Sequence, residues 1–473
     1  MSPAPSLVRP PARVLPEPAL RELPPPAPLR AMLGPGIVLA GLSIGSGEFV
    51  LWPRLTAEWG FAVFWAAWIG VTIQFFLNME IERYTLATGE SAVVGFLRLS
   101  RVFGPVFLLC GSLPWIWPGW ATGAGTILSW QLGGEPVAWA IGGLVLCGLV
   151  LSLGPVVYRT VETLMFVLVT LIFAALVVLA VLVVRPDAIG ELLAGAVRVG
   201  HVPEGIELPL LLGALAFAGA GGTLNLAQSN YVRDKGYGMG RWVGRITSPL
   251  TGREEAAGVV GYAFADTPES RARWRVWWRR TNLEHGLTFF LLCLVSITLL
   301  ALIAHSLLEP GAPVAEGFGF IADQGHALEE RFGPAARHAF LYAGIAVLFS
   351  TELVLLDAVS RVLTDLLHTM FFHGQQGWSP SRLYFTLLWI LIAFGALVLL
   401  LGLNQPLTLL VLSASLNAVV MFVYSGTLLW LGLASFRGPL RPGPVRIAAL
   451  GVSLAFFGTF SFLTLRDQLA RLL

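Results

Sequence analysis

A carboxylate stands beside two glycines and a serine inside an apolar stretch near the N-terminus. The segment LSIGSGEFVLWP, residues 42–53, contains Gly45, Ser46, Gly47 and Glu48 in a row. Glycine weakens a helix by about 1 kcal/mol relative to alanine, and a charge near a bilayer centre costs roughly 2.5–3.5 kcal/mol. An unwound helix tolerates both, because its freed carbonyl groups and the carboxylate can bind a cation. We therefore take Glu48 as a candidate metal ligand, in a pocket with the three residues before it.

A second apolar stretch is interrupted in the same way. Residues 211–230 read LLGALAFAGAGGTLNLAQSN, so small residues precede polar ones. Small residues also let helices pack closely. However, the two interruptions fall in the first and the sixth apolar stretches of the chain, and this placement favours a transport site. Asn417, in the apolar stretch 406–434, adds a third polar contribution. The candidate ion-binding residues here are Ala220, Gly221, Gly222, Thr223, Asn225, Gln228 and Asn417.

Glu352 is a further candidate, within the apolar stretch 337–366. No basic residue lies three or four positions away from it. An unpaired carboxylate inside a membrane is a candidate for ion coordination or for carrying a proton. The alternative is a protonated glutamate that bonds to a neighbouring helix. Asp357, Arg361 and Asp365 are spaced by four residues, which predicts a structural ladder of ion pairs on one helix face.

The composition places these residues in a membrane protein. Hydrophobic residues make up 56% of the 473 residues, charged residues make up 12%, and the mean hydropathy is +0.76. Soluble domains carry about 25% charged residues, and a membrane-spanning helix needs about 20 apolar residues. We expect an all-α integral membrane protein with eleven spans: 33–52, 61–86, 103–130, 136–154, 161–184, 207–231, 285–307, 337–366, 383–402, 406–434 and 446–465.

Arginine placement orients these spans. The loops after even-numbered spans are rich in arginine, and the loop after the sixth holds ten basic residues. Basic loops stay in the cytoplasm, so we expect an inner-membrane protein with a cytoplasmic N-terminus and an external C-terminus. The loop ends in RARWRVWWRRTNLE, which predicts a helix in the lipid headgroup layer. We expect four segments: a disordered, proline-rich cytoplasmic tail (1–30), six spans (31–231), a cytoplasmic loop (232–282) and five spans (283–473).

Two segments carry a resemblance to a known family. MLGPGIVLAGLSIGSGEF (32–49) and IERYTLATGES (81–91) resemble the first span and the end of the second span of natural-resistance-associated macrophage proteins, the Nramp metal-ion transporters. The resemblance implies a LeuT-like fold, in which two inverted repeats of five spans contain broken helices 1 and 6. It also implies proton-linked uptake of divalent metal ions by alternating access. The interruptions in spans one and six agree with that layout.

The metal-binding motifs of that family are altered here. Where the family carries Asp-Pro-Gly-Asn, Gly45 replaces the metal-binding aspartate and Glu48 replaces the asparagine. The family's Met-Pro-His motif falls at Ala220, Gly221 and Gly222, so neither thioether nor imidazole remains. Those softer groups help to select transition metals, whereas oxygen donors suit Mg²⁺ or Ca²⁺. We therefore expect a Mg²⁺-like hard cation to be favoured over Mn²⁺ or Fe²⁺.

Three functions remain open from the sequence. The first is a secondary transporter that moves a divalent cation, with or without protons. The second is a symporter for a small organic solute whose ammonium group pairs with Glu48. The third is a non-transporting membrane protein that keeps the fold. The chain shows no paired nucleophile and base and no phosphate-binding glycine loop, so we expect no enzyme, no cofactor and no nucleic-acid partner.

Overall fold

Proline begins many of the helices in this chain. Its fixed φ angle suits the first turn of a helix, where its missing N–H group is not needed. The computed structural model describes residues 6–248, 250–252, 258–308, 314–373, 375 and 377–472. Its helices are α1 (Pro35–Ser43), α2 (Trp52–Trp59), α3 (Trp65–Thr88), α4 (Ala92–Leu99), α5 (Phe103–Ser112), α6 (Gly119–Leu132), α7 (Pro136–Leu153), α8 (Val157–Val183), α9 (Pro186–Val197), α10 (Leu208–Ala216), α11 (Gly222–Asp234), α12 (Pro268–His285), α13 (Leu292–Leu307), α14 (Gly319–Phe332), α15 (Pro334–Leu367), α16 (Pro380–Leu400), α17 (Pro406–Ser435) and α18 (Pro444–Leu472).

These helices coincide with the predicted apolar stretches. Among the described residues, eight helices are long and apolar enough to cross a membrane. The other predicted spans correspond to α3, to α5 with α6, and to α10 with α11. The all-α architecture is therefore confirmed, and the count of eleven spans stays a prediction.

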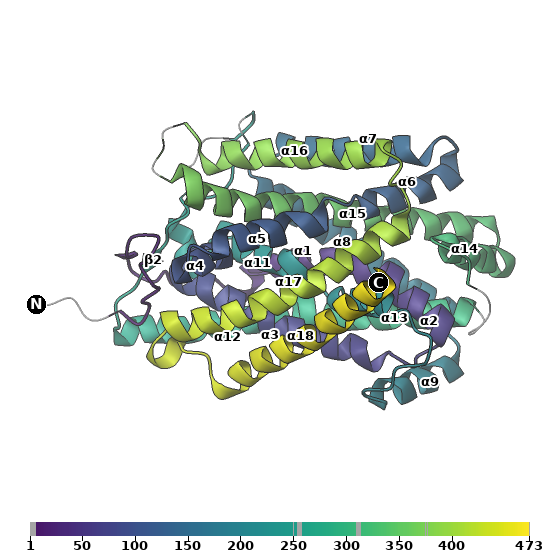
Figure 1. The fold of residues 1–473 in the computed structure, drawn as a ribbon, viewed down its shortest axis with the longest axis horizontal. Helices are drawn as coiled ribbons and strands as arrows, with labels where there is room; N and C mark the ends of the chain where they lie inside the picture. Colours follow the sequence, from purple (N-terminus) through teal and green to yellow (C-terminus); the bar gives the residue numbers. More distant parts are fainter. Residues whose placement is uncertain are drawn as a thin grey trace, which may run out of the picture.

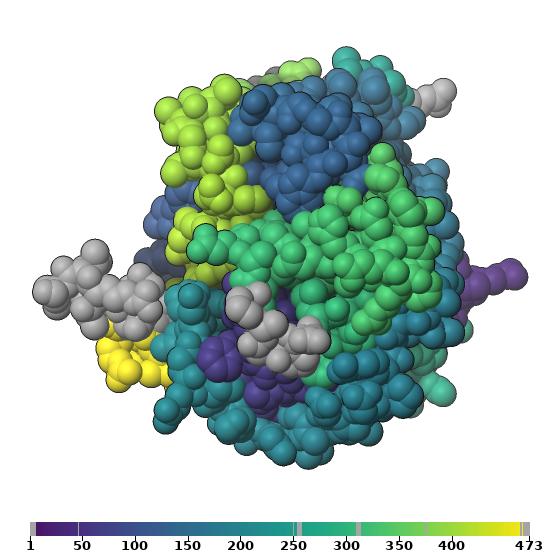
Figure 2. Space-filling view, turned by 90° about the vertical axis from the view of Figure 1, so that its right-hand side faces the viewer, coloured from purple at the N-terminus to yellow at the C-terminus, as the bar shows by residue number. Residues whose placement is uncertain are grey.

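The helices lie along the long axis of the molecule (Figure 1). In the most apolar part of Pro35–Trp59, 94% of the residues are buried, whereas in the most apolar part of α8 only 28% are. Most exposed side chains on α8 and α16 are apolar, among them Leu171, Val181 and Leu400, as expected for helices that face lipid. Figure 2 looks onto the end at the right of Figure 1, where green atoms of α14 and neighbouring α15 occupy much of the surface. The interrupted helices thus lie at the centre of the bundle.

The two interruptions take different physical forms. In the first, α1 passes into a π-helical segment, Ile44–Leu51, and then into α2. A π-helix has wider turns, and the N–H group of Trp52 accordingly bonds to the carbonyl group of Gly47, five residues earlier. In the second, α10 ends at Ala216, α11 begins at Gly222, and the residues between them are irregular. Helix 1 is therefore interrupted at the expected place, but by a π-helical segment instead of an unwound one.

The N-terminal segment differs from the disordered tail predicted over residues 1–30. In its described part, β1 (Ala19–Leu20) pairs in parallel with β2 (Tyr262–Ala263). Carbonyl groups of the segment also accept hydrogen bonds from Arg98 and from Trp277. Proline removes an N–H donor but keeps its carbonyl group as an acceptor, which explains how a proline-dense segment is held against the bundle.

The end of the 232–282 loop is helical, as expected, but its tryptophans lie elsewhere than predicted. α12 continues through a π-helical segment, Gly286–Leu291, into α13, so the expected boundary at residue 282 falls inside one long helix. Trp274 and Trp277 are buried in the protein, and Trp277 donates a hydrogen bond to the carbonyl group of Pro24 (2.9 Å). Trp277 therefore fastens α12 to the N-terminal segment, Trp274 packs against Phe264, and neither side chain faces lipid headgroups.

Candidate functional site

The gap between α10 and α11 exposes backbone groups in the buried interior. Gly219, Gly221 and Gly222 have φ angles of 145°, 75° and 53°. Only glycine adopts such angles without strain, so the glycines allow the helix to stop and restart here. Ala220, between them, is fully buried. We use the word gap below for residues 217–221.

Gln74 of α3 bridges this gap. Its Nε2 donates to the carbonyl group of Ala216 (3.0 Å), and its Oε1 accepts from the N–H group of Gly221 (3.0 Å). The same oxygen accepts a bond from Nδ2 of Asn225 (3.2 Å). One side chain thus satisfies polar groups at both edges of the gap, and a cation that binds the carbonyl oxygen of Ala216 must displace the Nε2 group of Gln74.

The first interruption packs directly against the second. A Cβ atom on Gly47 would overlap the carbonyl oxygen of Phe217, and one on Gly45 would overlap the hydroxyl group of Thr351 in α15. Both glycines therefore allow helix 1 to approach its neighbours closely. Ser46 lies between them, and its side chain is outside the described part of the structure. The structure thus places Gly47 at the gap and turns Gly45 toward α15.

Asn417 of α17 reaches the start of α11. Its Oδ1 accepts from the N–H group of Thr223 (3.3 Å), and its Nδ2 donates to the carbonyl group of Ser413 (2.9 Å). Gly222 leaves room for this amide, because a Cβ atom there would overlap it. Thr223 donates its hydroxyl hydrogen to the carbonyl group of Cys110 (2.6 Å). The structure therefore brings these expected residues together at the C-terminal edge of the gap.

Glu48 lies on another face of helix 1. Its carboxylate accepts hydrogen bonds from Ser43, one turn earlier (2.5 Å), and from Ser296 of α13. The side chain is fully buried. It follows directly after Gly47, which touches the gap, but it is turned toward α13. The structure therefore does not bring Glu48 into contact with the gap.

Glu352 is separate from the other expected site residues. Its Oε2 accepts from the N–H group of Ala121, in the first turn of α6 (3.2 Å), where a helix carries partial positive charge. It also lines a cavity of about 430 Å³ among mostly apolar side chains of α6, α7 and α15. The surroundings of Glu352 are therefore a helix N-terminus and an apolar cavity.

Asn225 and Gln228 carry oxygens without a hydrogen-bond partner in the described part of the chain. Asn225 donates to Gln74 and to the hydroxyl group of Tyr424 (3.0 Å), while its Oδ1 is unpaired. Gln228 places Nε2 3.5 Å from Nδ1 of His285, while its Oε1 is unpaired. Buried polar atoms nearly always have a partner, so these oxygens mark places where an ion or a water molecule can bind.

Aromatic rings border the gap. The ring centroid of Phe217 lies 6.0 Å from that of Trp115 and 5.7 Å from that of Trp120. Both tryptophans are buried. These rings form one wall of the gap, and the polar side chains of α3, α11 and α17 form the others.

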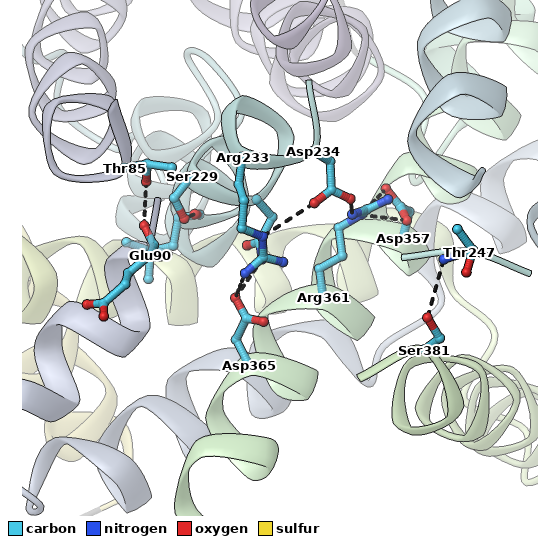
Figure 3. A network of polar contacts seen from close by, with 12 residues as sticks. Thr85, Glu90, Ser229, Arg233, Asp234, Thr247, Asp357, Arg361, Asp365 and Ser381 are labelled. Atoms are coloured by element: carbon cyan, nitrogen blue, oxygen red, sulfur yellow. Dashed lines mark hydrogen bonds and ion pairs between the residues drawn. The ribbon is translucent and has the colours of Figure 1, made fainter. Parts of the chain in front are cut away.

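A buried chain of ion pairs fastens α11 to α15 (Figure 3). Arg361 pairs with Asp357, four residues earlier (2.9 Å), and with Asp234 of α11 (2.5 Å). Arg233 pairs with Asp365 (2.8 Å). The ladder predicted on one face of α15 thus continues onto α11. Because breaking a buried pair costs about 3–5 kcal/mol, this cluster holds the second half of the interrupted helix in place.

The donors around the gap are oxygens and amides. Among the described residues, no three Asp, Glu, His or Cys side chains stand close enough together to hold a metal ion. What the gap offers is backbone carbonyl groups with the side chains of Gln74, Thr223, Asn225 and Asn417. Such ligands fit a hard cation that keeps part of its water shell.

Two residues of this site, Gln74 and Tyr424, are not among the candidates from the sequence, where the spacing of Gln74 and Asn78 is interpreted as a helix–helix contact. Gln74 stands four residues before Asn78 and eight before Glu82, which places three polar side chains on one face of α3. That spacing is the signal that finds Gln74. Tyr424 offers no such signal, because a tyrosine in an apolar span is ordinary near a bilayer surface.

Comparison with known proteins now supports one family. The family model for natural resistance-associated macrophage protein-like proteins matches residues 55–462. A solved structure of a variant manganese transporter from Eremococcus coleocola has a TM-score of 0.68 at 14% identity, covering 93% of this chain and 87% of that chain. A second variant of that transporter has a TM-score of 0.65 at 14% identity, covering 96% and 90%. No curated protein sequence matches the chain. The transporter fold expected from the resemblance is confirmed, and the chain belongs to the natural resistance-associated macrophage protein-like family, whose members are membrane transporters of divalent metal ions.

Proposed function

We propose that this protein is a secondary transporter that moves a divalent cation across the inner membrane by alternating access. The cation passes the gap between α10 and α11, where Gly47 of helix 1 touches it. Family membership supports metal transport. The route and the selectivity rest on the geometry of the gap.

The bridge made by Gln74 is the observation that carries this proposal. It satisfies the carbonyl group of Ala216 and the N–H group of Gly221 at once. A hydrogen bond that is exchanged for another partner contributes only about 0.5–1.5 kcal/mol. A cation can therefore take the place of the Nε2 group on the carbonyl oxygen of Ala216 at small cost.

Glu48 supplies negative charge next to the gap. It is one residue from Gly47, and two serine hydroxyl groups donate to its carboxylate. Opposite charges attract each other over several ångströms where water is excluded. The carboxylate thus favours a cation in the gap without being its ligand.

The donor set favours a Mg²⁺-like ion. Oxygen ligands bind hard cations, and soft sulfur or imidazole ligands are what favour transition metals over them. We propose in addition that Glu352 carries a proton during transport, because it is a buried carboxylate that accepts a single N–H bond from Ala121.

The orientation is part of the proposal. The N-terminal segment and the 232–282 loop lie in the cytoplasm, and the C-terminus lies outside. The arginine-rich loops after even-numbered spans support this arrangement.

Uptake of Mg²⁺ into proteoliposomes tests the route. Gln74→Leu keeps the size of the side chain but removes its bridge, so uptake should fall about tenfold, which corresponds to about 1.4 kcal/mol. The matched control is Gln324→Leu, because Gln324 is also buried but lies in α14 and bonds within its own helix. Unchanged uptake by folded Gln74→Leu protein would show that the gap is not the route.

A further inference from the structure

A stripe of polar side chains runs between α3 and α11 and leads away from the gap. On α3, Gln74, Asn78 and Glu82 are spaced by four residues and share a face. On α11, Asn225 bonds to Gln74 (3.2 Å), and Gln228 lies beside Glu82. We call these five residues the α3–α11 seam. At 1.5 Å per residue it extends about 12 Å along α3.

The charge of Glu284 acts on Glu82 at the far end of this seam. Both side chains are buried, and their carboxylates are close enough to repel each other. Glu284 uses Oε1 to accept from the N–H group of Gly36, at the start of α1 (3.2 Å), and from the hydroxyl group of Thr288 (3.1 Å). Within the described ranges, its Oε2 and both oxygens of Glu82 have no partner at full hydrogen-bond geometry, and the amide of Gln228 is the side chain that comes nearest to bonding Glu82.

Two basic side chains act on this pair, but each is bonded to another carboxylate. Arg446 attracts Glu82 and bonds to Glu80 (3.1 Å). Lys235 attracts Glu284 and pairs with Glu162. Burying two carboxylates without a direct positive partner is unfavourable. Among the described residues, the pair therefore lacks a cation of its own.

Uncharged polar side chains that could bind a metal ion gather at the same place. Both amide atoms of Asn78, Oε1 of Gln228 and Nε2 of His285 have no partner in the described chain, and all three side chains are fully buried. Gln228 lies between Glu82 and His285. It is beside Glu82, and its Nε2 is 3.5 Å from Nδ1 of His285. Two carboxylates with amide oxygens are the ligands that hard cations prefer.

We propose that Glu82 and Glu284, together with Asn78 and Gln228, form a second cation site that binds a divalent ion of hard-oxygen preference. The role of the site rests on the proposed function: it lies on the seam that begins at the gap, so it receives an ion that leaves the gap. The bond from Gly36 to Glu284 also links an ion bound there to the position of α1.

Counting bound ions tests this site. Mn²⁺ is the probe, because oxygen ligands suit it and its free aqueous form is measured directly by electron paramagnetic resonance. In lipid nanodiscs, the double variant Glu82→Gln/Glu284→Gln should bind one Mn²⁺ fewer per chain than the wild type. The control Glu191→Gln removes an exposed carboxylate of α9 and should leave the count unchanged.

A second variant addresses failure to fold. Glu82→Asp keeps the charge on a shorter side chain, so the ion should still bind, with lower affinity than in the wild type and higher affinity than in Glu82→Gln. Equal counts and affinities in all folded variants would overturn the proposal. So would a double variant that changes only proton uptake on acidification, because the pair would then hold protons and no metal.

The gap is tested separately from this site. Gln74→Leu should lose uptake into proteoliposomes and keep the ion bound by Glu82 and Glu284. Normal uptake in Gln74→Leu would count against the route through the gap, whereas an unchanged ion count in the double variant would count against the second site. The two failures are therefore distinguishable.

Discussion

Gly47 and Phe217 bring the two interrupted helices into direct backbone contact. A Cβ atom on Gly47 would overlap the carbonyl oxygen of Phe217, the first residue after α10. The π-helical segment thus presents bare backbone to the gap. Because both backbones are buried and in direct contact, movement of one interruption requires movement of the other.

Gly47→Ala should reduce transport, because it adds a methyl group at this contact. The added Cβ atom meets backbone, which cannot rotate away, and overpacking of this kind costs about 1–3 kcal/mol. Gly143→Ala in α7 is the control, because nothing lies within 4 Å of its added Cβ atom. Melting temperature and Mg²⁺ uptake should fall for Gly47→Ala only. If both variants behave like the wild type, the contact is not a tight one.

Glu48→Gln should reduce cation uptake while leaving the fold nearly intact. The change removes the negative charge beside the gap but keeps the shape of the side chain. Ser296→Ala removes one hydrogen bond to Glu48 and keeps the charge, so its uptake should remain close to that of the wild type. Uptake is measured in proteoliposomes and folding by thermal unfolding. Loss of stability with uptake retained in Glu48→Gln would mean that Glu48 serves packing alone.

The transporter should show little preference for Mn²⁺ or Cd²⁺ over Mg²⁺. The donors at the gap are oxygens and amides, and selection of softer ions needs sulfur or imidazole. Competition between these ions for uptake into proteoliposomes measures the preference. Strong Mn²⁺ or Cd²⁺ uptake that resists excess Mg²⁺ would show that the donor set has been misassigned.

Arg361→Gln should destabilise the protein severely. It leaves the buried carboxylates of Asp234 and Asp357 without their shared partner, at a cost of about 3–5 kcal/mol. The exposed pair of Arg185 with Asp187, at 3.8 Å, is the control. Arg185→Gln should cost no more than about 1 kcal/mol. Denaturant unfolding in detergent compares the two variants, and similar losses would argue against a structural role for the cluster.

Cysteine labelling should report the orientation. In a variant without Cys110, Cys147 and Cys293, a cysteine at the exposed position Ala272 should resist an impermeant reagent added outside intact cells. A cysteine at the exposed position Val199 should react. The reverse pattern would invert the proposed topology.

Part of the site was predictable because its signals are local. Glycines at positive φ leave a mark in the sequence, and Gly219 to Gly222 predict the gap directly. Asn417 and Thr223 carry polar groups in apolar spans, which cannot face lipid at low cost. The direction in which Glu48 points is different, since it depends on Ser296 of α13, more than two hundred residues away along the chain.

The sequence by itself determined that the chain is a bundle of apolar helices with two interruptions, because hydropathy and glycine content act on each segment separately. It also placed the chain beside one transporter family through residues 32–49 and 81–91. Only the tertiary structure decided that Gln74 bridges the gap, that helix 1 passes it as a π-helix, and that the charge of Glu284 acts on Glu82. These relationships join residues far apart in the chain, and no local property of a segment states which distant helix will pack against it.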